Sequence, residues 1–132
     1  MSELDNRIGD YAAAIVRDAD LLLADAAHLN NEQLNFVSAI KRTAGYILDL
    51  YTDYTSASPE FDTDNYAFSL RPPLSNIAGY CELLGRTDEF GSLSEAQLQR
   101  LNQIQASQQL MRHQLDRWRD AEVEKRRNSG TR

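Results

Sequence analysis

Four stretches of this chain place apolar residues at steps of three and four, and glycine and proline are scarce inside them. This spacing gathers the apolar side chains on one face of an α-helix, whereas a strand would show alternation. The stripes run through residues 3–27, 30–54, 70–84 and 95–121. The spacing therefore predicts an all-α protein built from four helices.

Local signals place the helix ends. Asn30 or Asn31 can cap the second helix, and Ser94 with Gln97 three residues later forms a capping box for the last one. The segment 56–69 is rich in Ser, Asp and Asn and reads as a linker. We expect the third helix to begin near Pro72, because proline is tolerated in a first turn.

The apolar stripes also match one another in pairs. Shifted by 62 residues, the first stripe falls on the third, and shifted by 64 residues, the second falls on the fourth. This favours either a duplicated helical hairpin or two hairpins that share only the geometry of a bundle. The paired positions are Ile8/Leu70, Ala12/Leu74, Ile15/Ile77, Ala19/Cys81, Leu22/Leu84, Val37/Leu101, Ile40/Ile104, Ala44/Gln108, Ile47/Met111, Tyr51/Leu115 and Tyr54/Trp118.

Both interpretations predict one architecture, an antiparallel four-helix bundle made of two helical hairpins. We expect a single domain over residues 1–132, because each hairpin has an apolar seam that must be covered. Hairpin one spans about residues 3–55, the linker 56–69, and hairpin two about residues 70–124. Residues 125–132 form a basic tail, which we expect to be solvated and frayed.

Composition excludes several classes of function. No apolar run approaches the roughly 18 residues of a membrane span, and the polar N-terminus does not resemble a secretory signal. Residues 1–66 carry 12 acidic and 4 basic side chains, and the remainder carries 8 acidic and 10 basic ones, which argues against nucleic-acid binding. The single cysteine, Cys81, permits a reducing compartment, so we expect a cytoplasmic protein without membrane contact.

The second hairpin resembles the dimerisation and phosphoacceptor domain of sensor histidine kinases over about residues 66–120. That family has a phosphoacceptor box, Ser-His-Glu-Leu-Arg-Thr-Pro-Leu, followed by Ile-x-Gly-Tyr-x-Glu-Leu-Leu. The residues that match the two motifs here are Leu70, Arg71, Pro73, Leu74, Ile77, Gly79, Tyr80, Glu82, Leu83 and Leu84. The resemblance implies a four-helix bundle on which a receiver domain docks.

The chain departs from this family at the residues that carry its chemistry. Phe68 stands at the phosphoacceptor histidine, and Ser69 stands at the acidic residue beside it. Phenylalanine has no nucleophilic nitrogen, and no ATP-binding domain follows in this sequence, so we expect no enzyme activity. Two histidines and one cysteine at distant positions make no metal-site spacing, and we expect neither a metal nor a cofactor.

Three functions stay open. The first is a non-catalytic, histidine-kinase-like adaptor or inhibitor that binds a receiver domain or a sensor kinase. In the family the receiver docks on this part of the helix, which implies a partner surface of Phe68, Arg71, Leu74, Ser75 and Ala78. The second is a phosphotransfer relay through His113 or His28, and the third is a purely structural scaffold or oligomerisation bundle. We favour a monomer closed by its own two hairpins, with a homodimer as the alternative.

Overall fold

The computed structural model describes residues 2–56 and 63–130, and four long helices contain most of them. A 3-10 turn, η1 (Ala26–His28), and a short helix, α4 (Thr87–Phe90), lie in the loops between the long helices. No strand occurs in the two described ranges, so the all-α prediction is confirmed. The long helices are α1 (Ser2–Ala24), α2 (Asn31–Ser56), α3 (Thr63–Gly85) and α5 (Glu95–Gly130).

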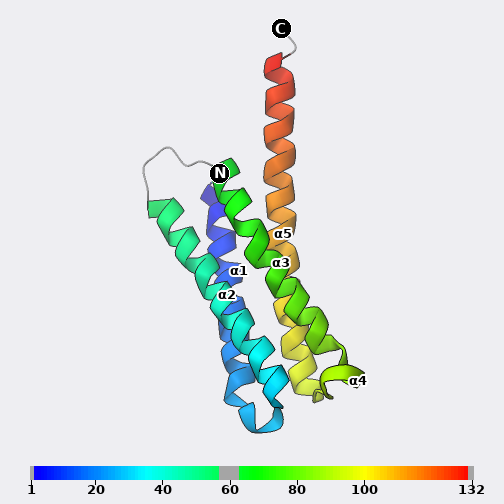
Figure 1. The fold of residues 1–132 in the computed structure, drawn as a ribbon. Helices are drawn as coiled ribbons and strands as arrows, with labels where there is room; N and C mark the ends of the chain where they lie inside the picture. The colour runs from blue at the N-terminus through cyan, green and yellow to red at the C-terminus, as the bar shows by residue number, and fades with distance from the viewer. Residues whose placement is uncertain (1, 57–62, 131–132) are drawn as a thin grey trace.

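The long helices form two antiparallel hairpins whose loops lie at the same end of the bundle (Figure 1). Hairpin one is α1 with α2, and hairpin two is α3 with α5. Both α1 and α3 pack against α2 and α5, so α1 lies diagonal to α3. The predicted two-hairpin bundle is confirmed.

The paired apolar stripes meet in one hydrophobic core to which all four long helices contribute. Equivalent positions are buried alike: Ile15 and Ile77 are fully buried, and so are Ile40 and Ile104. Gln108, the position that matches Ala44 of hairpin one, is also buried. Its Nε2 has no hydrogen-bond partner among the described residues. Among the paired positions, the exceptions are Tyr51 and Tyr54, which are only half-buried.

The start of α3 differs from the prediction. The helix begins at Thr63, so residues 63–69 are not linker, and Pro72 and Pro73 lie inside the helix. Tyr66 explains the extra turns, because it is fully buried and its ring centroid lies 4.9 Å from that of Tyr54 and 5.9 Å from that of Trp118. Tertiary packing has outweighed the cost of proline in a helix interior. The remaining predicted linker residues, 57–62, lie outside the described residues.

The last helix is longer than predicted. It continues to Gly130, and its C-terminal part extends past the ends of the other helices (Figure 1). The side chains of residues 125–128 are exposed, as predicted for the basic tail, but the expectation that this tail is frayed is wrong up to residue 130. Residues 131–132 lie outside the described ranges. Glu, Lys and Arg are good helix formers, and no glycine or proline interrupts residues 95–129.

The first hairpin starts its second helix with a capping box. The Gln33 backbone N–H donates to Asn30 Oδ1 at 2.8 Å, and the Asn30 backbone N–H donates to Gln33 Oε1 at 2.9 Å. Gln33 Nε2 then reaches the other hairpin and donates to the Gly91 and Ser92 carbonyl oxygens at 3.1 and 3.2 Å. Gly91 has φ of 117°, which favours glycine, and it lies close against Asn30.

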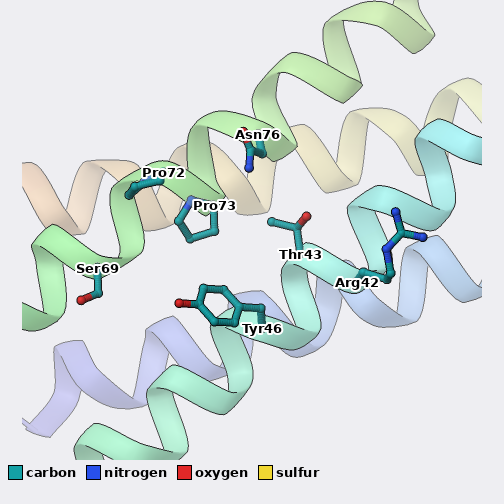
Figure 2. Close-up of a pocket in the computed structure, with 7 residues that line it drawn as sticks. All are labelled: Arg42, Thr43, Tyr46, Ser69, Pro72, Pro73 and Asn76. Atoms are coloured by element: carbon teal, nitrogen blue, oxygen red, sulfur yellow. The ribbon is translucent and has the colours of Figure 1, made fainter.

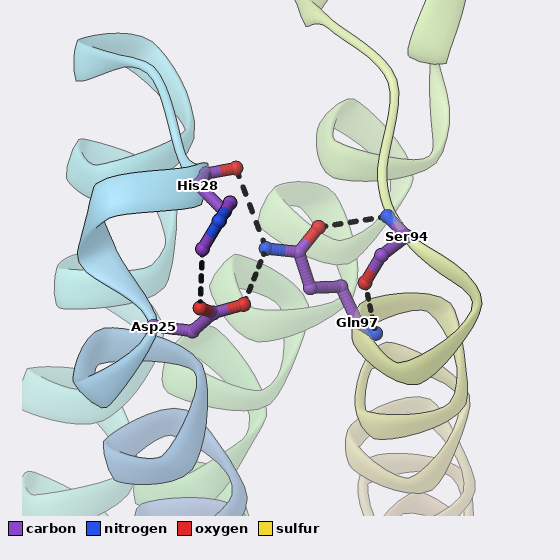
Figure 3. Close-up of polar contacts among 4 residues, drawn as sticks. All are labelled: Asp25, His28, Ser94 and Gln97. Atoms are coloured by element: carbon purple, nitrogen blue, oxygen red, sulfur yellow. Dashed lines mark hydrogen bonds and ion pairs between the residues drawn. The ribbon is translucent and has the colours of Figure 1, made fainter.

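The second hairpin repeats this arrangement, as the Ser94 and Gln97 spacing predicted. The Gln97 backbone N–H donates to Ser94 Oγ at 3.1 Å, and the Ser94 backbone N–H donates to Gln97 Oε1 at 2.8 Å. Gln97 Nε2 donates to Asp25 Oδ2 at 3.2 Å and to the His28 carbonyl oxygen at 3.4 Å (Figure 3). Each capping glutamine thus ties its own helix start to the loop of the other hairpin.

Candidate functional site

The outer face of α3 carries most of the predicted partner surface. Phe68, Arg71, Ser75 and Ala78 are spaced by three and four residues, which places them on one side of the helix. Phe68 is 76% exposed, Ser75 is exposed, and Arg71 and Ala78 are half-buried. The structure therefore keeps these four side chains together on one reachable face.

Leu74 does not belong to this face. Its side chain is 1% exposed and forms part of the core, at the position equivalent to Ala12 in α1. The expectation that a partner touches Leu74 is wrong, because a protein docking from outside cannot reach a side chain closed off by the bundle. Its place in the apolar stripe at residues 70–84 already indicated a core position.

Phe68 lies at a groove between α3 and α5 of about 230 Å³, which we call the α3/α5 groove. Arg71 lies beside it and donates through Nη2 to Asp116 Oδ1 of α5 at 3.3 Å. With both side chains partly exposed, this ion pair contributes little to stability, on the order of 0.5 kcal/mol. The groove is lined by Ala67, Phe68, Arg71, Trp118, Arg119, Val123 and Arg126.

The α5 wall of this groove is a part of the site that was not predicted from the sequence. Arg119, Val123 and Arg126 follow one another at steps of four and three, so they continue one side of the helix. Trp118 beside them is 5% exposed, and its indole Nε1 has no hydrogen-bond partner among the described residues. Arg119 and Val123 fall inside the predicted hairpin over residues 70–124, but Arg126 falls in the tail that was expected to fray.

A second groove, the α2/α3 groove, lies on the other side of α3 and has a volume of about 350 Å³. Figure 2 shows Tyr46 of α2 facing Pro73 of α3, with Ser69 toward one end and Arg42 toward the other. No local sequence pattern predicts this groove, because it joins residues far apart in the chain. It is lined by Arg42, Thr43, Tyr46, Ser69, Pro72, Pro73 and Asn76.

The two histidines lie apart from both grooves. His113 is exposed on α5, and His28 lies in η1, where Nδ1 and Asp25 Oδ1 are 2.7 Å apart. Asp25 and the His28 carbonyl oxygen also accept the side-chain N–H groups of Gln97 (Figure 3). His28 is therefore part of the contact between the hairpin loops.

The single cysteine, Cys81, is buried in α3 and has no disulfide partner among the described residues. Burial raises the pKa of the Cys81 thiol to about 12, so it stays protonated and unreactive near neutral pH. No group of three or more His, Cys, Asp or Glu side chains in the described ranges is arranged to hold a metal ion. What the described surface does offer is exposed aromatic and arginine side chains beside two grooves.

Comparisons with protein-family models, with curated proteins and with solved structures find no match to this chain. Within the described ranges, none of the helices combines the length and the apolar character that crossing a membrane requires.

Proposed function

We propose that this chain is a non-catalytic, histidine-kinase-like bundle that binds a receiver domain or a sensor kinase in the cytoplasm, as an adaptor or inhibitor. The observation that carries the proposal is Phe68, a large aromatic side chain left 76% exposed where the resembled family has its phosphoacceptor. Burying such a side chain against a partner contributes about 2 kcal/mol, which is typical of an interface anchor.

The surroundings of Phe68 support a docking role. Arg71, Arg119 and Arg126 line the same groove, in a chain whose formal net charge is −6. Aromatic and arginine side chains are the types most enriched at the centres of protein interfaces. A partner with an apolar contact ringed by carboxylates fits this surface, and receiver domains and kinases are the partners that the motif implies.

Binding is tested in two stages. Receiver domains and sensor kinases from the same genome are screened by pull-down or two-hybrid assay, and each positive is measured by isothermal titration calorimetry. Phe68→Ala should raise the dissociation constant at least about tenfold, because the exposed ring is the proposed anchor. The free energy of unfolding of Phe68→Ala should differ from that of the native chain by less than about 0.5 kcal/mol, since the side chain makes few contacts in the free chain.

A matched control keeps the result specific. Leu21→Ala removes an apolar side chain that is 43% exposed on α1, the helix diagonal to α3, and should leave binding unchanged. A screen without any receiver or kinase partner would reject the proposed function. If Phe68→Ala raises the dissociation constant no more than Leu21→Ala does, the proposed site is wrong.

We also propose that the chain is a monomer. Both hairpins contribute to one core, so a single chain already covers the apolar seam that the resembled family closes with two chains. Light scattering should give a mass near 15.0 kDa. Twice that mass would favour the homodimer instead.

A further inference from the structure

The α2/α3 groove combines size with two polar groups, the Arg42 guanidinium and the Tyr46 hydroxyl, that have no partner among the described residues. Its volume of about 350 Å³ falls within the range of small-molecule sites, roughly 300–1,000 Å³. The side chains around it come from two hairpins, so the groove exists only in the assembled bundle.

At one end of the groove, the prolines leave a backbone acceptor without its helical donors. A carbonyl in an α-helix accepts from the N–H four residues on, and in a 3-10 helix from the N–H three residues on. For Ser69 these residues are Pro73 and Pro72, and neither has a backbone N–H. The Ser69 carbonyl oxygen is therefore an acceptor that both helical patterns leave unused, on a residue that lines the groove.

At the other end, Arg42 supplies a charge that is not neutralised. Its side chain is exposed and makes no hydrogen bond or ion pair with any other described residue. Its neighbour Lys41, by contrast, pairs with Asp20 at 2.7 Å. A guanidinium group prefers a carboxylate or a phosphate, which it can bind through two parallel hydrogen bonds.

Between these ends the walls are made of rings. Tyr46 and Pro73 face one another across the groove, and Pro72 lies beside them (Figure 2). Tyr46 is 54% exposed, and its hydroxyl has no hydrogen-bond partner among the described residues. A flat aromatic ring packs well against such surfaces.

The α1/α5 face is the other face where the two hairpins meet, and its equivalent positions lack these features. Pro72 and Pro73 of α3 correspond to Asp10 and Tyr11 of α1, which both have a backbone N–H. Tyr46 and Arg42 of α2 correspond to Leu110 and Ala106 of α5. The acceptor, the cation and the rings therefore occur together only at the α2/α3 face, and bundle packing alone does not require them.

We propose that the α2/α3 groove binds a small aromatic carboxylate that also carries an N–H donor. The carboxylate pairs with Arg42, the aromatic ring lies between Tyr46 and Pro73, and the N–H donates to the Ser69 carbonyl oxygen. This proposal does not depend on the proposed partner-binding function, because the α3/α5 groove uses other side chains.

The test uses three probes that differ by one group each: indole-3-propionate, 1-methylindole-3-propionate and 3-propylindole. Each is titrated into the full ¹⁵N-labelled chain and followed by backbone amide shifts. Indole-3-propionate should move the Thr43, Tyr46 and Asn76 signals saturably, with a dissociation constant on the order of 1 mM for a ligand of this size. The methylated probe should bind about threefold more weakly, and the probe without a carboxylate about tenfold more weakly.

Variants assign the effect to the groove. Arg42→Gln should raise the dissociation constant of indole-3-propionate about tenfold, to a value close to that of 3-propylindole. Arg112→Gln removes the same charge from an exposed position on α5 and should have no effect. Unsaturable shifts, equal affinity for the three probes, or equal affinity of Arg42→Gln and Arg112→Gln would overturn the proposal.

Discussion

Hairpin one and hairpin two bury their cores in the same way but present different outer faces. Equivalent apolar positions are closed off in both, and the two capping glutamines, Gln33 and Gln97, make matching contacts across the loops. The exposed Phe68, the proline pair and the grooves described above all involve α3 of hairpin two. The shared features are those that any bundle of two hairpins needs, so the unshared ones are where specific function should be sought.

The two faces where the hairpins meet show the same contrast. Across α1 and α5, Arg100 Nη1 lies 3.4 Å from Oδ1 of the buried Asp18. At the equivalent positions across α2 and α3, Phe36 and Tyr80 pack with ring centroids 6.1 Å apart. One face is joined by an ion pair and the other by aromatic contact, so the hairpins are similar in backbone and core but not in interface chemistry.

The largest expected effect tests whether the cores are equivalent. Ile40→Ala and Ile104→Ala each remove a fully buried side chain at paired positions. Each should lower the free energy of unfolding by about 3 kcal/mol, and the two values should agree within about 1 kcal/mol. Urea unfolding followed by circular dichroism measures both. A clearly smaller loss for one of them would show that the two hairpins are not packed alike.

The next effect concerns the loop contacts. Gln33→Ala and Gln97→Ala each delete a cap acceptor and an Nε2 donor to the other hairpin. The acceptors that lose this donor are the Gly91 and Ser92 carbonyl oxygens for Gln33, and the His28 carbonyl oxygen and the Asp25 carboxylate for Gln97. We expect each to cost about 1–2 kcal/mol of unfolding free energy in the same urea experiment. Gln99→Ala, at an exposed position of α5, is the control and should be close to neutral. If Gln33→Ala or Gln97→Ala matched this control, the cross-hairpin contacts would not stabilise the bundle.

A smaller effect of opposite sign is expected where the cores differ. Gln108 is 3% exposed with its Nε2 unsatisfied among the described residues, whereas hairpin one has Ala44 at the paired position. Gln108→Met keeps the length of the side chain and removes the buried polar group, so it should stabilise the fold by about 1 kcal/mol. Thermal unfolding would detect this gain, and Gln109→Met at an exposed neighbour should show none. A loss of stability instead would mean that the Gln108 amide is satisfied in solution.

The smallest effect distinguishes Cys81 from its paired residue, Ala19. Burial raises the pKa of the Cys81 thiol to about 12 from 9.0, so the unfolded chain loses this proton at a lower pH than the folded one. The folded state then binds more protons between these values, and stability falls as the pH rises above about 9. Relative to Cys81→Ala, the native chain should lose about 0.8 kcal/mol between pH 8 and pH 9.5.

The measurement is urea unfolding at both pH values, with iodoacetamide labelling as a second readout. Native Cys81 should be alkylated only as fast as the chain unfolds, because the protonated, buried thiol is a poor nucleophile. Rapid labelling of the folded chain at pH 8 would contradict the burial of this side chain.

The core and the helix starts could be predicted because they depend on local spacing. Apolar residues at steps of three and four define a buried face, and the Ser94 and Gln97 capping box marks a helix start in any context. The same spacing places Leu74 in the apolar stripe, where a side chain is not available to a partner. Four of the five residues predicted to contact a partner lie on one face because their spacing is also helical.

The start of α3 and the end of α5 could not be predicted, because local rules favoured the wrong outcome there. Proline normally marks a first turn, but Tyr66 is buried against Tyr54 and Trp118, and this long-range contact extends the helix ahead of Pro72. The α2/α3 groove was missed for a related reason. It joins Arg42 and Tyr46 to Ser69 and Pro73, and no local pattern links residues from different hairpins.

The sequence by itself determined that the chain is helical and which face of each helix is buried. These properties follow from the period of the α-helix and from the chemistry of single side chains. Only the tertiary structure decided which helices are neighbours, how far α3 and α5 extend, and which polar groups meet at the grooves. Those outcomes depend on contacts between distant residues, whose free energy outweighs local preference once the bundle closes.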